Sequence, residues 1–205
     1  EIRGAGDLLG GEQSGFINEM GFETYQKILD EAINELKEDS FKNLDLEKNK
    51  FSKKVNLVFE TDLELMFPNN YINSSTERLK LYTQLNKICE LDELNSFKLE
   101  LTDRFGTLPN VVVELLNSLE LRWLAGASGF DKIVLKKNIL ISYMMNFDSD
   151  EQKKKIDKLF DYSKLNPNSI SFSQKKLADG DRFIVKIKNI DSVSKAIKVL
   201  EDINT

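Results

Sequence analysis

The sequence predicts an α+β fold, in which a loop and a long amphipathic helix precede a mixed domain with antiparallel hairpins and several helices. Apolar residues recur at every second position over residues 55–59, 133–135, 139–141, 170–172 and 183–187, as in half-buried strands. Between these segments apolar residues recur every three or four positions, as in amphipathic helices, and the order has no regular βαβ repeat. The chain can form a hydrophobic core, because 40% of its 205 residues are hydrophobic.

The N-terminal quarter of the chain differs from the rest. Residues 1–15 contain five of the ten glycines, which predicts a shaped loop. Apolar residues from Phe22 to Leu36 form one stripe opposite an acidic face, which predicts a helix. Residues 38–54 are mostly polar and suit a linker, so we divide the chain into segments 1–54 and 55–205. Because it begins at Glu1 rather than Met, we expect a piece of a longer protein.

The second segment opens with alternation over residues 55–59, which predicts a strand, and with a similar alternation over 63–67 before Pro68. Ser74 and Glu77 resemble a capping box, in which Glu77 would reach back to the helix start. The helix that follows has an apolar stripe formed by Leu79, Tyr82, Leu85 and Ile88, with Cys89 near it.

Two further helices are predicted before residue 130. Gly106 is placed to end the first of these helices, and Pro109 suits the first turn of the next. The first stripe comprises Leu94, Phe97, Leu101 and Phe105, and the second comprises Val112, Leu115, Leu116, Leu119 and Trp123 or Leu124.

The last third of the chain predicts two hairpins, each followed by a helix. Alternation over 133–135 and 139–141 flanks a turn at residues 136–138, and alternation over 170–172 and 183–187 flanks a turn at 178–181. The apolar stripe of the first of these helices comprises Ile156, Leu159 and Phe160. The stripe of the second comprises Val193, Ala196, Ile197 and Leu200.

The residue inventory excludes several kinds of chemistry. The chain has no His and a single Cys, Cys89, so neither a Ser–His–Asp nor a Cys–His system can be assembled, and zinc lacks ligands. One Cys forbids an intramolecular disulfide, which suits a reducing, cytoplasmic setting, and no apolar run approaches the roughly 20 residues that span a bilayer. We therefore expect a non-enzymatic binding segment without cofactor or metal, with Cys89 as a core residue.

The charge is uneven along the chain. The net charge is −5, and residues 1–40 hold ten acidic residues against three basic ones, so global attraction to nucleic acid is not expected. Lysines cluster at residues 53–54, 136–137, 153–155 and 175–176. Solvated faces and turn tips explain them; the alternative is that residues 55–205 bind DNA directly through these lysines. A cation site could be formed by Asp148, Asp150 and Glu151, but acidic residues are also common at the start of a helix.

Two groups of polar residues are candidate sites. In the glycine-rich loop, Arg3 offers a fork of donors and Gln13 both a donor and an acceptor; a plain connector is the alternative. In the helix before Gly106, spacings of three and four place Glu100, Asp103 and Arg104 on neighbouring turns of one face. That face is either a solvated surface with an internal Glu100–Arg104 pair or a docking surface.

Several stretches resemble bacterial transcription-repair coupling factors. The run Glu1–Gly10 followed by Glu12–Gly15 resembles the end of the translocation motif that these factors share with the helicase RecG. Features similar to the coupling factors specifically are the stretches Glu19–Tyr25, Tyr71–Ile72 with Arg78–Tyr82, and Glu100–Pro109. The resemblance extends from residue 1 to about residue 140, in the expected order.

The resemblance implies a function for the parent protein and a smaller role for this chain. The parent would be an ATP- and Mg-dependent DNA translocase that displaces stalled RNA polymerase and recruits UvrA. Arg3 and Gln13 match loop positions that couple hydrolysis to movement, but the motor lobes are missing. Glu100, Asp103 and Arg104 match positions that dock on a UvrB-like N-terminal module. The implied role is an autoinhibitory C-terminal domain; the alternative is a DNA-binding accessory domain of the same motor or of a RecG-like helicase.

Overall fold

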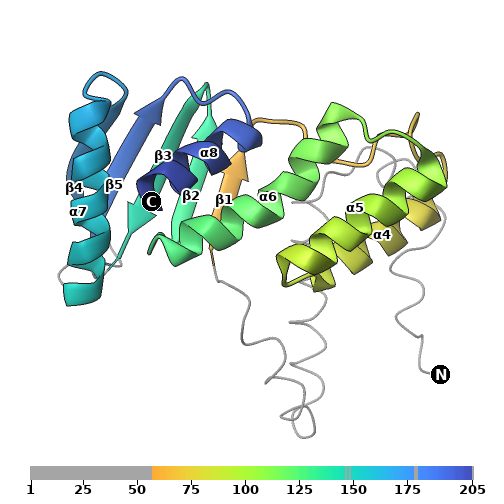
Figure 1. Ribbon diagram of the computed structural model, residues 1–205, viewed down its shortest axis with the longest axis horizontal. Coiled ribbons are helices and arrows are strands. Elements are labelled where there is room, and N and C mark those ends of the chain that lie inside the picture. Colours follow the sequence, from red (N-terminus) through yellow and green to blue (C-terminus); the bar gives the residue numbers. More distant parts are fainter. Residues whose placement is uncertain (1–56, 146, 148, 178–179, 205) are drawn as a thin grey trace, which may run out of the picture. The chain divides into compact units, whose positions relative to one another are not determined.

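The computed structural model describes residues 57–204 except 146, 148 and 178–179. The predicted segment 1–54, with its loop residues Arg3 and Gln13 and its helix over 22–36, lies outside the described residues. The described part is α+β, as predicted, and combines five helices with a five-stranded mixed sheet (Figure 1). It divides into two compact units: residues 64–115, here called the helical unit, and residues 57–63 with 116–204, here called the sheet unit.

The helical unit contains α4 (Ser75–Lys87), α5 (Leu91–Phe105) and the beginning of α6 (Asn110–Ala127). Helix α5 ends at Phe105, with Gly106 at its C-cap as predicted, and α6 begins directly after Pro109. The core of this unit is apolar and almost completely enclosed; its members include Leu81, Leu85, Leu94, Phe97, Leu101, Val112 and Leu115.

The prediction of extended structure over 63–67 is wrong. The regular strand β1 ends at Thr61, and residues 62–67 form bends and irregular backbone. Phe67 is buried at 1% exposure, and its backbone N–H donates to the hydroxyl of Tyr82 at 3.0 Å instead of to a neighbouring strand. The two rings pack with centroids 4.9 Å apart. The apolar Phe67 is therefore buried by packing on Tyr82 of α4 and not by a place in a strand.

The stripe predicted for α4 is also shifted. Leu81 and Arg78 are buried beside Tyr82 and Leu85, whereas Leu79 is half-buried. Arg78 is only 2% exposed because its guanidinium donates to the carbonyl of Ile72 at 2.6 Å and to that of Asn73 at 3.3 Å. The burial of a cation that binds backbone carbonyls cannot be predicted from the spacing of apolar residues.

Cys89 is exposed, so its prediction as a core residue is wrong. Helix α4 ends at Lys87, and Ile88 already has an extended backbone with φ −68° and ψ 126°. Cys89 therefore lies beyond the helix and does not continue its apolar side.

The sheet unit is built on the strand order β1-β2-β3-β5-β4. Strand β1 (Val58–Thr61) runs parallel to β2 (Lys132–Lys136), and the other neighbours are antiparallel. Both predicted hairpins are present: β2 with β3 (Ile139–Met144), and β4 (Ile170–Leu177) with β5 (Gly180–Lys188). The first turns at Lys137 and Asn138, whose φ values of 52° and 59° are those of a two-residue type I′ turn.

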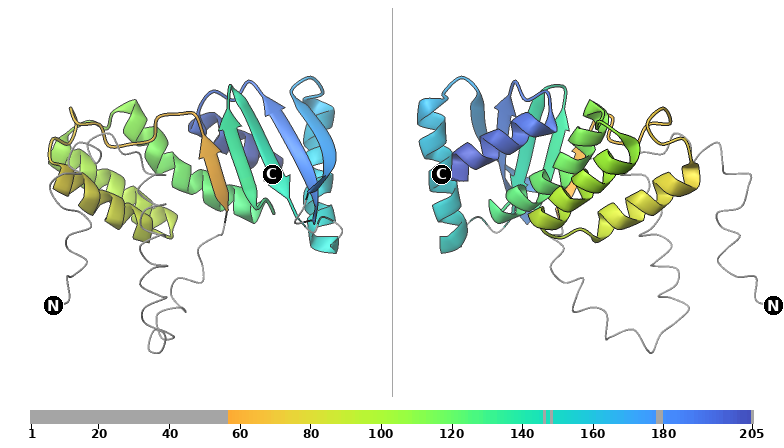
Figure 2. Two further views of the ribbon diagram at one scale, coloured as in Figure 1. Left: turned by 180° about the vertical axis from the view of Figure 1, so that it is seen from behind. Right: turned by 45° about the vertical axis from the view of Figure 1, so that its right-hand side comes forward.

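Helices cover one face of this sheet (Figures 1 and 2). They are the C-terminal half of α6, α7 (Asp150–Leu165) and α8 (Val193–Asn204), and the last two were predicted from their stripes. Ser149 begins α7 by accepting from the N–H of Gln152 at 3.3 Å, which supports the helix-start interpretation of its neighbouring acids. Phe160 of α7 packs on Phe172 of β4 with centroids 4.8 Å apart, which fixes α7 on this face.

Candidate docking site

The predicted face of α5 contains a formed ion pair. Arg104 donates from Nη1 to Oε1 of Glu100, one turn earlier, at 2.8 Å. Both side chains are partly exposed, at 38% and 41%. The structure thus brings together two of the three predicted residues, through the helical i, i+4 spacing.

A third residue, Glu77 of α4, joins this pair. Its Oε1 accepts a hydrogen bond from Nη2 of Arg104, so the guanidinium bridges two helices. The capping box is consequently only half formed: Ser74 accepts from the N–H of Glu77 at 3.3 Å, but the Glu77 carboxylate is turned to Arg104. A charge-assisted bond to a guanidinium is stronger than a bond to a neutral backbone amide, which explains this departure from the prediction.

The surroundings of Arg104 fix both its charge and its orientation. The hydrogen bond that Arg104 donates to Glu77, followed by the one that it donates to Glu100, raises the pKa of Arg104 above its usual value. Its guanidinium carbon lies 4.8 Å from the centroid of the Phe105 ring, a cation–π distance. Arg104 is therefore a permanently charged group held in one place, not a pH switch.

The end of α5 that carries this cluster is itself anchored. Gly106 has φ 85°, a conformation that favours glycine, and its N–H donates to the carbonyl of Thr102 at 2.9 Å. The hydroxyl of Tyr71 lies within 3.2 Å of the Leu101 carbonyl and 3.1 Å of the Gly106 carbonyl, so it can donate to either. The Tyr71 ring meets Phe105 edge-on at 5.9 Å. These contacts keep the last turn of α5 in a fixed position.

Asp103, the third predicted residue, is exposed, and no ion pair is formed by it among the residues that the structure describes. Leu99 lies one turn earlier on the same side of α5 and is 73% exposed. We call the group formed by Glu77, Leu99, Glu100, Asp103 and Arg104 the α5 cluster. It combines one apolar side chain, one available carboxylate and one preoriented guanidinium.

Sequence reasoning missed two members of this cluster. Leu99 could have been found, because it is out of phase with the stripe at residues 94, 97, 101 and 105, and an apolar residue on a polar helix face is a docking signal. Glu77 could not, because it is 27 residues from Arg104 and meets it only through the packing of α4 on α5.

Other kinds of site are not supported by the described residues. Over residues 57–204 with their gaps, no group of three or more His, Cys, Asp or Glu side chains could hold a metal ion. Within the same ranges, no helix combines the length and the apolarity that crossing a membrane requires.

Comparison with known proteins identifies the family. The TRCF domain model matches residues 61–159, which include all of α5. A transcription-repair-coupling factor of Rickettsia typhi is 31% identical over 181 residues, or 87% of this chain. The chain belongs to the family of transcription-repair coupling factors. The factors of Haemophilus influenzae and Bacillus subtilis agree, with 38% identity over 60% of the chain and 31% over 74%.

A solved structure supports the same assignment for the fold. The crystal structure of a C-terminal domain of transcription-repair coupling factor superposes with a TM-score of 0.53 and 15% identity, covering 73% of this chain and 92% of that one. The chain spans 10–15% of the length of these three curated coupling factors. Glu100, Asp103 and Arg104 lie within the stretch matched by the family model, whereas Arg3 and Gln13 lie outside it.

Proposed function

We propose that this chain is the regulatory C-terminal part of a DNA-repair coupling factor and that the α5 cluster docks on the UvrB-like N-terminal module of the same protein. The observation that carries the proposal is the exposed Asp103 and Leu99 beside a guanidinium that two carboxylates hold in place. Their position in the family-matched stretch supports the same interpretation.

The composition of the cluster suits an interface that must open. Charged contacts across an interface supply orientation and partner choice more than net affinity. Leu99 supplies an apolar anchor that a partner pocket would enclose, and the charged residues around it would exclude water from that contact. Arg104 is already ordered by Glu77 and Glu100, so binding would cost little additional side-chain entropy. Such a contact is specific but releasable.

In the whole protein this contact would act as an autoinhibitory lock. The docked state would cover the surface of the N-terminal module that recruits UvrA, and engagement of stalled polymerase would release it. The ATP- and Mg-dependent translocation on DNA would belong to motor lobes elsewhere in the parent, to which Arg3 and Gln13 of the loop would be coupled. This segment would then regulate the motor without catalysing a reaction itself.

The direct test is to mix this chain with the N-terminal module of its parent protein and to measure association by isothermal titration. Asp103→Lys should weaken association by about tenfold, because the carboxylate that would pair with a cation of the N-terminal module is replaced by an ammonium that this cation repels. Glu90→Lys makes the same change of charge about 20 Å away at the other end of α5 and should leave association nearly unchanged. Leu99→Ser should also weaken association, and the effect of this neutral change should be insensitive to salt.

The consequence of docking is tested in the parent protein. Asp103→Lys there should increase UvrA binding and basal ATPase activity, and Glu90→Lys should increase neither. If Asp103→Lys weakens association of the separated parts but leaves UvrA affinity unchanged, docking is real and the masking role is wrong. If association is unaffected by both Asp103→Lys and Leu99→Ser, the α5 cluster is not the docking surface.

A further inference from the structure

The sheet of the sheet unit has one face that no described element of that unit covers. Helices α6, α7 and α8 lie on the opposite face, where Leu135, Leu140 and Val185 are buried (Figure 2). The side chains that alternate with these form what we call the open face. It comprises Val58, Glu60, Lys132, Val134, Lys136, Ile139, Ile141, Tyr143, Ser171, Ser173, Lys175, Arg182, Ile184, Lys186 and Lys188.

The register of the strands arranges this face in rows. Strand β3 contributes Ile139, Ile141 and Tyr143, which are half-buried and which we call the β3 strip. On one side, Lys132 lies opposite Tyr143 and Lys136 opposite Ile139. The other flank is formed by β5, where Lys186 pairs with Ile141 and Lys188 with Ile139. An apolar and aromatic strip thus runs between two rows of cationic side chains.

The two rows differ in how far their charge is already neutralised. On the β2 side, Glu60 binds Lys132 at 2.6 Å and Lys136 at 3.1 Å, and these hydrogen bonds hold the pKa of Glu60 below its usual value. On the β5 side, Lys186 and Lys188 are exposed and form no ion pair within the described ranges. The second row is available to an external anion.

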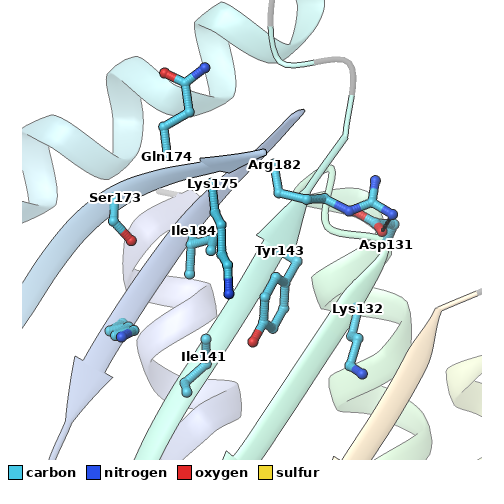
Figure 3. A pocket seen from close by; sticks show the side chains of 10 residues that line it. Asp131, Lys132, Ile141, Tyr143, Ser173, Gln174, Lys175, Arg182 and Ile184 are labelled. Atoms are coloured by element: carbon cyan, nitrogen blue, oxygen red, sulfur yellow. Dashed lines mark ion pairs between the residues drawn. The ribbon is translucent and has the colours of Figure 1, made fainter. Parts of the chain in front are cut away.

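One end of the face is hollowed into a depression of about 650 Å³. Figure 3 shows Lys132, Tyr143 and Lys175 on the same side of the sheet, with Gln174 pointing the opposite way. The Tyr143 and Ser173 hydroxyls line it beside these lysines, and the Lys132 ammonium lies 6.0 Å from the Tyr143 ring centroid. An aromatic face, hydroxyl donors and ammonium groups meet in one place.

Across the whole open face, cations exceed carboxylates strongly. Six cationic side chains occupy it. Among the described residues, Glu60 on the face binds Lys132 and Lys136, and Asp131 at its end lies 3.5 Å from Arg182. Surfaces that bind single strands without sequence preference combine such a cationic track with a platform on which bases stack.

We propose that the open face binds single-stranded nucleic acid. Phosphates contact Lys175, Lys186 and Lys188, which form no ion pair with a carboxylate of the described residues, and bases lie on the β3 strip with Tyr143 as the stacking side chain. An unpaired strand fits better than a duplex, because a duplex hides its base faces and would leave the β3 strip without an apolar partner. An acidic peptide could match the charge but offers no aromatic base to stack on Tyr143.

The test uses the 205-residue chain and a fluorescein-labelled oligothymidylate of about 20 nucleotides, followed by fluorescence anisotropy at several salt concentrations. Replacing Lys186→Glu and Lys188→Glu together should weaken binding at least tenfold. Loss of two phosphate contacts should also reduce the magnitude of the slope of log affinity against log salt by about 1.4. The matched control replaces Lys154→Glu and Lys198→Glu, two exposed lysines on α7 and α8, and should change affinity less than twofold.

A second variant separates base stacking from attraction to any polyanion. Tyr143→Leu keeps an apolar side chain but removes the aromatic ring, and should weaken oligothymidylate binding by about fivefold or more. Its affinity for heparin, which has no bases, should be unchanged. Circular dichroism and a thermal melt confirm that each variant is folded.

Three outcomes would overturn the proposal. The first is equal affinity of the unchanged chain and of the variant with both Lys186→Glu and Lys188→Glu. The second is tighter binding of a duplex of the same length, and the third is tighter binding of polyglutamate than of oligothymidylate. This proposal does not rest on docking by the α5 cluster, because Asp103→Lys and Leu99→Ser alter no residue of the open face.

Discussion

The helical unit and the sheet unit carry opposite charge. Residues 64–115 contain eight acidic and five basic residues, whereas the described residues of the sheet unit contain sixteen basic and twelve acidic ones. The net charge of −5 for the whole chain includes residues outside the described units and does not show this contrast. A single net charge is therefore a poor guide to the partners of either unit.

The backbone geometry of each unit explains how its charges are handled. A helix places residues i and i+4 side by side, so Glu100 can neutralise Arg104 within α5. A strand places residues i and i+2 on one face, so Lys186 and Lys188 reinforce each other on β5. The same density of charged residues produces a balanced cluster on a helix and an unbalanced row on a strand.

The largest expected effect tests whether the units are independent. Leu101 in α5 and Leu140 in β3 are both fully buried, and replacing either by Ala should cost about 3 kcal/mol of unfolding free energy. If the units unfold separately, Leu101→Ala should increase amide hydrogen exchange in residues 64–115 and leave β3 and β5 protected, and Leu140→Ala should do the reverse. Equal loss of protection in both units for either variant would contradict the division.

A smaller effect is expected at the two tyrosines that distinguish the units. In the helical unit, the Tyr82 hydroxyl accepts from the N–H of Phe67, so Tyr82→Phe leaves a buried donor unsatisfied and should cost about 1–2 kcal/mol. Tyr143, half-buried on the open face, forms no described hydrogen bond through its hydroxyl, so Tyr143→Phe should cost little. Urea denaturation measures both.

The buried Tyr82 also predicts that the stability of the protein depends on pH in the alkaline range. Burial raises the pKa of Tyr82 from 10.0 to about 12. Because the folded-state pKa is above the unfolded value, the stabilisation is complete below pH 10 and is lost as pH rises from 10 towards 12. Tyr82→Phe should remove this loss, so its stability should fall less between pH 9 and pH 12, as urea denaturation at each pH can establish. An unchanged alkaline dependence would contradict this assignment.

The predictable parts of the fold are those with local causes. The hairpin turn at Lys137 and Asn138, the end of α5 at Gly106 and the stripe of α8 are all set by residues within a few positions of one another. The irregular backbone over 62–67 was not predictable from alternation, since the buried Tyr82 that holds Phe67 comes 15 residues later.

The same distinction separates the predictable from the missed residues of the candidate sites. The pair Glu100–Arg104 follows from spacing alone, and the structure contains it. The Glu77 contact and the open face depend on long-range packing and on strand register, which place Lys186 beside Ile141 across a separation of 45 residues in sequence. Of the lysine pairs visible in the sequence, Lys175 and Lys176 are neighbours on β4 and therefore point to opposite faces of the sheet.

The smallest expected effect sharpens the contrast in charge between the units. Glu60 is 41% exposed and binds Lys132 and Lys136, so Glu60→Gln should change stability by less than about 0.5 kcal/mol at pH 7. The pKa of Glu60 is lowered in the folded state, so its contribution is present at neutral pH and is lost as pH falls below 4.5. Thermal melts at pH 7 and pH 3 should therefore show a difference between the two proteins only at pH 7.

The same substitution has a larger consequence for binding than for stability. Without the Glu60 carboxylate, Lys132 and Lys136 become available beside the β3 strip, so oligothymidylate should bind about twofold more tightly and with a steeper salt dependence. Glu77→Gln makes the same change of charge on the helical unit, where the carboxylate holds Arg104. It should leave oligothymidylate binding unchanged, because the basic surface that we propose belongs to the sheet unit. Equal gains in affinity for the two variants would indicate a response to total charge rather than to the open face.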